Sequence, residues 1–112
     1  MTVNDICGRL EAKLLCGNGE KTFSGVYVGD LLSRAMGHVE ADNLWVTIMS
    51  NVNVIAVATL TEPAAVILAE NETLEADELK KADENRITVL TSPLSAYEIC
   101  ARVSKAISEN GA

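Results

Sequence analysis

The hydrophobic positions of the chain alternate between runs with strand periodicity and runs with helical periodicity. Continuous or alternating apolar stretches predict five strands, at residues 10–16, 22–28, 44–49, 64–69 and 87–90. Stretches with helical spacing or position predict helices at residues 3–7, 31–36, 54–60, 74–84 and 96–107. This order favours one α/β domain over residues 1–112, in which helices flank a mixed, mainly parallel sheet.

The segment from Thr22 to Met36 has the pattern of a strand, a tight turn and a helix. Val26, Tyr27 and Val28 are strong strand formers. Asp30 lies where its carboxylate can accept the free N–H groups of the next turn, so we expect it to cap the helix that follows. Gly37 is expected to end that helix in the left-handed conformation.

The first two strands are expected to form a hairpin. Gly17-Asn18-Gly19 turns the chain between residues 10–16 and 22–28, and the loop is too short to contain a crossover helix. Antiparallel strands tolerate such a short loop, whereas parallel strands need a longer connection. The sequence therefore predicts an antiparallel pair at the start of the chain and largely parallel strands after it.

The ends of the last two helices carry capping signals. Residues 96–107 show the spacing of one buried helical face, and this helix has two candidate caps. One is Ser92, with proline at the first helical position, and the other is Ser95, with Glu98 completing a capping box. Asn85 is expected to end the preceding helix in the left-handed conformation.

Composition limits the classes of partner. The formal net charge is -7 and the nine basic residues are scattered, which argues against nucleic acid, because such binding depends on clustered Lys and Arg. The N-terminal residues show no leader pattern and no apolar run is long enough to span a membrane, so we expect a soluble, cytoplasmic protein without a membrane partner. Cys7, Cys16 and Cys100 are odd in number and widely spaced, which favours reduced, buried thiols.

No stretch carries a recognisable reaction centre. Residues 19–22 end in Lys-Thr like a phosphate-binding loop, but Glu20 replaces the required glycine and a strand follows instead of a helix. His38 is the only histidine and has no partner pattern for a triad or a metal. The acidic residues between 70 and 78 lack the spacing of a calcium loop and suit a solvated helix start. We expect no catalysis, no metal and no cofactor.

Polar side chains follow three of the predicted strands and are the candidate ligand-binding residues. They are Asp30, Ser50, Asn51, Asn53, Thr91 and Ser92. In open α/β sheets, ligands bind beyond the carboxyl ends of the strands, where helix N-termini present N–H groups to anions. Lys21 or Arg34 would be the nearest cation, whereas Asp30 suits a ribose hydroxyl. The alternative is that these side chains only cap helices.

Residues 20–32 carry a resemblance to a known family. The part from Val26 to Leu32, Val-Tyr-Val-Gly-Asp-Leu-Leu, resembles the DRTGG domain, a module that also forms the N-terminal part of HPr kinase/phosphorylase and occurs in some phosphotransacetylases and CBS-domain pyrophosphatases. Glu20, Lys21 and Ser24 replace the Asp, Arg and Thr of the family signature. Lysine in place of arginine removes a bidentate fork.

The resemblance spans essentially the whole chain and implies a fold like the HPr kinase N-terminal domain. It implies a non-catalytic regulatory module, without the kinase half, that forms a homodimer and binds a small, nucleotide-like anion. The alternative is a protein-protein adaptor without a small ligand, associated with a metabolic or redox enzyme complex. Exposed apolar residues near the signature would supply the dimer interface: Tyr27, Leu31, Leu32 and Met36.

Overall fold

The computed structural model describes residues 1–110, which form a five-stranded sheet. The strands are β1 (Lys13–Cys16), β2 (Val26–Val28), β3 (Leu44–Thr47), β4 (Ala65–Leu68) and β5 (Val89–Thr91). Their order is β1-β5-β4-β3-β2; β2 to β5 run parallel, and β1 pairs antiparallel with β5. The predicted α/β class, with a mixed and mainly parallel sheet, is confirmed.

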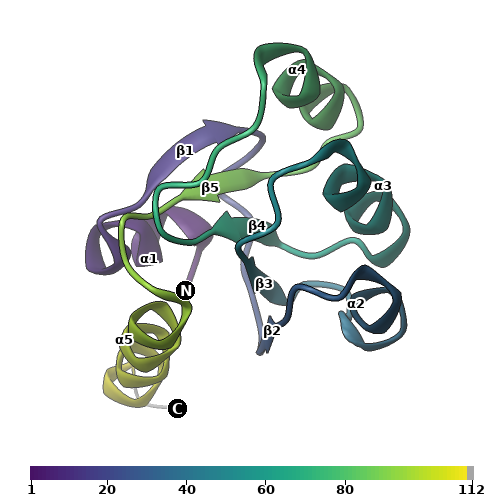
Figure 1. Cartoon of the computed structure of the whole chain (residues 1–112). Helices are drawn as coiled ribbons and strands as arrows, with labels where there is room; N and C mark the ends of the chain where they lie inside the picture. The colour runs from purple at the N-terminus through teal and green to yellow at the C-terminus, as the bar shows by residue number, and fades with distance from the viewer. Residues whose placement is uncertain (111–112) are drawn as a thin grey trace.

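Helices cover both faces of this sheet (Figure 1). The elements are α1 (Val3–Leu10), α2 (Leu32–His38), α3 (Val52–Thr61), α4 (Ala76–Glu84) and α5 (Ala96–Glu109). Side chains of α1 and α5 share one core cluster, whereas those of α2, α3 and α4 share the other. The sequence of β4 is continuously apolar because the strand is buried on both faces: Ala65 and Ile67 lie in the first cluster, and Val66 and Leu68 lie in the second.

Local capping explains where several helices begin. A capping box joins Thr2 and Asp5 at the start of α1, and a second joins Ser95 and Glu98 at the start of α5. Of the two caps predicted for α5, Ser95 is the one that forms. At α3 the side chain of Asn51 accepts from the backbone N–H of the second helical residue.

The predicted hairpin is wrong, because β1 and β2 lie at opposite edges of the sheet. Residues 17–25 cross the sheet instead of turning back. Fully extended they reach about 30 Å, and the four inter-strand spacings that separate the two edges amount to about 19 Å. Backbone bonds fix the crossing segment, from Val3 N to the Lys21 carbonyl at 2.8 Å and from Ser24 N to the Asp42 carbonyl at 2.8 Å. A loop of this length therefore permits either a hairpin or a crossing to the far edge of the sheet, and the crossing forms.

Three predicted helix ends also differ from the structure. Helix α1 continues to Leu10, which shortens the strand expected at residues 10–16. Helix α2 runs through Gly37 to His38 and ends on an extended residue, so Gly37 is not a left-handed stop. Asn85 has φ -89°, and the left-handed residue is the next one, Arg86, with φ 62°. The local sequence signals alone therefore do not fix the positions of these three helix ends.

Candidate functional site

Asp30 joins the carboxyl ends of β2 and β3. Its Oδ1 accepts hydrogen bonds from Thr47 Oγ1 at 2.8 Å and from Ile48 N at 2.9 Å. It does not cap α2, because Leu31 occupies the N-cap position of α2 without a side-chain bond. The prediction of a helix cap at Asp30 is therefore wrong, and the carboxylate instead ties two parallel strands together where they end.

Glu72 connects the loops beyond β3, β4 and β5. The Ser50 hydroxyl donates to Glu72 Oε1 at 2.8 Å, and the Thr91 hydroxyl donates to the Glu72 carbonyl at 2.7 Å. Glu72 is not among the residues predicted for the site, because the acidic stretch around it predicts only a solvated helix start. Glu70 and Asn71 just before it adopt left-handed backbones with φ 57° and 62°, a conformation that is uncommon outside glycine and that Asn adopts more readily than Glu.

The remaining predicted residues differ in accessibility. Asn51 is half-buried and Asn53 is exposed at the start of α3, and neither side-chain NH₂ group donates a hydrogen bond within residues 1–110. Ser92 is fully buried, with its hydroxyl donating to the Leu10 carbonyl at 2.7 Å and accepting from Leu94 N at 3.2 Å. The carboxyl edge thus brings Asp30, Ser50, Asn51 and Thr91 to one rim, whereas Ser92 lies in the core.

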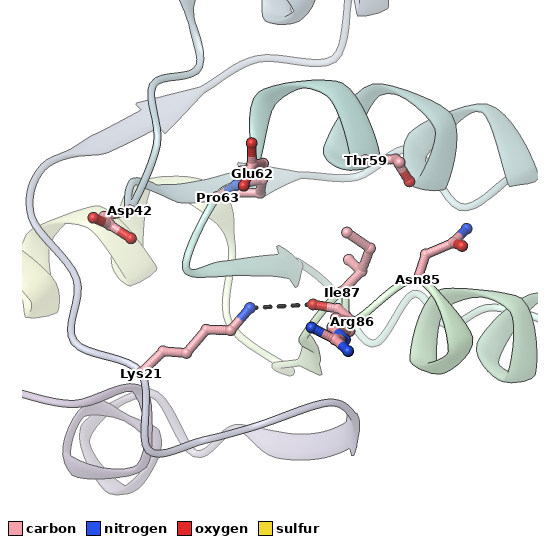
Figure 2. Close-up of a pocket in the computed structure, with 8 residues that line it drawn as sticks. All are labelled: Lys21, Asp42, Thr59, Glu62, Pro63, Asn85, Arg86 and Ile87. Atoms are coloured by element: carbon pink, nitrogen blue, oxygen red, sulfur yellow. Dashed lines mark hydrogen bonds between the residues drawn. The ribbon is translucent and has the colours of Figure 1, made fainter.

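A cavity of about 460 Å³ lies at the opposite edge, where β3, β4 and β5 begin (Figure 2). Its lining residues are Lys21, Asp42, Thr59, Glu62, Pro63, Asn85, Arg86 and Ile87. Lys21 was expected near the carboxyl rim, and this is wrong, because the crossing segment carries it to the amino edge. There Lys21 Nζ donates to the Arg86 carbonyl at 3.1 Å.

The turns that build this cavity share an unusual backbone. Asp42, Glu62 and Arg86 each precede a strand of the sheet and have φ 67°, 56° and 62°. Left-handed conformations are uncommon outside glycine, so the surrounding packing holds these turns in place. All three side chains are charged and exposed. Asp is enriched in this conformation and Glu and Arg are not, so residue type alone does not predict these three turns.

Burial raises the pKa of the thiols of Cys7, Cys16 and Cys100, which keeps them protonated near neutral pH. His38 stacks on Tyr27 with ring centroids 6.0 Å apart. In the part of the chain from residue 1 to 110, no group of three or more His, Cys, Asp or Glu side chains could hold a metal ion. None of the helices described has the length and apolar character needed to cross a membrane.

Comparison with known proteins identifies the family. The fold is that of an α/β domain with helices on both faces, and the model of the DRTGG domain matches residues 5–106. The chain therefore belongs to the DRTGG domain family. A comparison with curated proteins found no significant match.

A solved structure supports the same fold. It contains the CBS and DRTGG domains of the regulatory region of Clostridium perfringens pyrophosphatase, complexed with the activator diadenosine tetraphosphate. The match has a TM-score of 0.78 and 18% sequence identity, and covers 91% of this chain. This chain spans 45% of that one. At this identity the likeness establishes the fold.

Proposed function

We propose that this chain is a cytoplasmic regulatory domain that binds a small, nucleotide-like anion and does not itself catalyse a reaction. The observation that carries the proposal is the polar carboxyl rim, where loops beyond three parallel strands meet through Glu72. Membership of the DRTGG family supports a regulatory role. The pyrophosphatase regulatory region of the same fold is complexed with a nucleotide activator, which makes nucleotides the first ligands to test.

Two kinds of group at the rim suit a nucleotide. The side-chain NH₂ groups of Asn51 and Asn53 stand at the start of α3, where the helix dipole also favours a phosphate. Asp30 offers a carboxylate that accepts from a ribose hydroxyl while it holds Thr47. Ser50 and Thr91 position the loop through Glu72, and Ser92 contributes from the core by fixing the turn that follows β5.

Calorimetry with AMP, ADP, ATP, diadenosine tetraphosphate and acetyl phosphate tests this assignment. Asn53→Ala removes an exposed amide that makes no side-chain bond within residues 1–110, so it should weaken binding without a loss of stability. Asn51→Ala should weaken binding too, with a capping loss of about 1 kcal/mol. Asn85→Ala is the matched control, since it removes an exposed amide at the opposite edge. Failure of every compound to bind tighter than millimolar would refute the sensing role.

We also propose a homodimer whose interface includes α2 and β2. Leu31 is 62% exposed, Met36 is 50% exposed and Val28 is 47% exposed, while Tyr27 and Leu32 are half-buried beside them. A neighbouring group of exposed apolar side chains is typical of an interaction surface. Light scattering should give twice the 11.9 kDa chain mass.

The same surface supports a second candidate function, an adaptor that binds another protein without a small ligand.

Two variants test the homodimer. Met36→Lys should dissociate it, whereas Tyr97→Glu on α5, where the side chain is 81% exposed, should leave it intact. A monomer at high micromolar concentration, together with no nucleotide binding, would favour the adaptor. Transfer of labelled phosphate from ATP that depends on the protein would contradict the non-catalytic assignment.

A further inference from the structure

The cavity at the amino edge has walls of opposite charge. Lys21 and Arg86 belong to one wall, since Lys21 Nζ donates to the Arg86 carbonyl at 3.1 Å. Asp42 and Glu62 belong to the other, since Asp42 N donates to the Glu62 carbonyl at 3.1 Å. Figure 2 shows the two pairs on opposite sides of the space between them. The lining therefore has no net charge but a clear polarity.

The two walls do not neutralise each other by direct contact. The ion pairs within residues 1–110 are Arg9–Glu109 and Arg102–Glu11, and neither involves this cavity. The Lys21 ammonium uses one donor on the Arg86 carbonyl and keeps two others. The guanidinium of Arg86 makes no hydrogen bond to the described residues and offers a planar fork that suits a carboxylate.

The backbone keeps these walls apart. Glu62 ends α3 in a left-handed turn, with its N–H donating to the Ala58 carbonyl at 2.8 Å. Arg86 is held in the same conformation by a bond from its N–H to the Asp83 carbonyl at 3.0 Å. Pro63 and Ile87 supply apolar lining between the charged groups. The backbones that carry Glu62 and Arg86 are therefore fixed by hydrogen-bonded turns.

We propose that this cavity binds a small zwitterion of the amino-acid class. The ligand carboxylate binds Lys21 and Arg86, and the ligand ammonium binds Asp42 and Glu62. A simple anion would gain the two cations but would meet the two carboxylates and the negative C-terminal end of α3. A simple cation would gain the two carboxylates but would be repelled by Lys21 and Arg86. A molecule with both charges satisfies both walls, and the volume of about 460 Å³ lies in the ordinary range of small-molecule sites.

This site is separate from the nucleotide site proposed at the carboxyl rim. The twenty common amino acids, each titrated singly and followed by NMR chemical shifts, serve as probes. For the best binder, the N-acetyl derivative removes the ammonium and the carboxamide removes the carboxylate. Each derivative should bind at least about tenfold more weakly, because each loses a charge-assisted contact.

Three variants assign the binding to the two walls. Arg86→Gln and Glu62→Gln should each weaken binding of the best amino acid about tenfold or more. Arg86→Lys keeps the positive charge but loses the planar fork, so it should weaken binding less than Arg86→Gln does. Glu70→Gln is the matched control for Glu62→Gln, because Glu70 is also exposed and left-handed but lies at the carboxyl edge. Asn53→Ala should leave amino-acid binding unchanged, which separates this site from the nucleotide site.

The outcomes that would overturn the proposal are distinct. Equal binding of the N-acetyl derivative would mean a plain anion site, and equal binding of the carboxamide would mean a plain cation site. Absence of any shift with all twenty probes at millimolar concentration would also overturn it. Loss of nucleotide binding alone would leave it intact, and circular dichroism on each variant would confirm that the fold survives.

Discussion

Ser92→Ala tests whether Ser92 has a structural role or a ligand-binding role. The hydroxyl is fully buried and bonds the Leu10 carbonyl at 2.7 Å and Leu94 N at 3.2 Å, so it links the end of α1 to the turn before α5. Removing it leaves two buried polar groups without this partner, at about 1–3 kcal/mol each. We expect a loss of about 2–6 kcal/mol, which is a large part of the total stability of about 5–15 kcal/mol of an ordinary domain.

Urea denaturation followed by circular dichroism measures this change. The midpoint should fall while the slope stays constant, because the surface exposed on unfolding is nearly the same. Ser95→Ala is the matched control three residues further on, where loss of the α5 cap should cost about 1 kcal/mol. A loss below about 0.5 kcal/mol at Ser92 would refute the reasoning, since a hydroxyl so placed would then contribute no more than one on the surface.

Two further predictions concern pH. The backbone N–H of Thr2 donates to the Asp5 carboxylate and lowers its pKa, so the stabilising effect is present above the ordinary pKa of aspartate and is lost as pH falls through the lower pKa of the folded state. Asp5→Asn should therefore make the free energy of unfolding less dependent on pH in this acidic range. An unchanged pH dependence would contradict this. Burial raises the pKa of the Cys100 thiol, so its reaction with a thiol reagent in a Cys7→Ser, Cys16→Ser background should be slower at pH 7 than that of free cysteine and should accelerate as pH rises; a rate equal to that of free cysteine would show that the thiol is not shielded.

Features of the fold that depend on neighbouring residues are predictable from the sequence, and features that depend on tertiary packing are not. Residues 44–47 and 65–68 form buried parallel strands, as their nearly continuous apolar sequence predicts, because burial on both faces favours apolar side chains. Thr47 is the one buried polar residue among them. The pairing of the first two strands is not local, since residues 17–25 are long enough either to turn back or to cross the sheet. The left-handed turns at Asp42 and Arg86 are held by tertiary packing, so their position was not predictable from residue type.

The crossing segment explains why the Glu20 to Gly25 part of the family signature lies at the edge of the sheet opposite the predicted rim, whereas Asp30, later in the signature, lies on that rim. Location rules for α/β sheets select the carboxyl edge, because strands end and helix N-termini begin there. The antiparallel β1 sends the chain across the amino edge before β2 can start, and the Glu20 to Gly25 part of the signature forms this crossing. Gly25 adopts φ 77° and an added Cβ would lie 3.0 Å from the Asn43 amide, so the glycine is needed for β2 to enter beside β3. The Glu20 to Gly25 part of the signature therefore both sets the strand order and places Lys21 at the charged cavity, which ties the topology of this sheet to the chemistry of its amino edge.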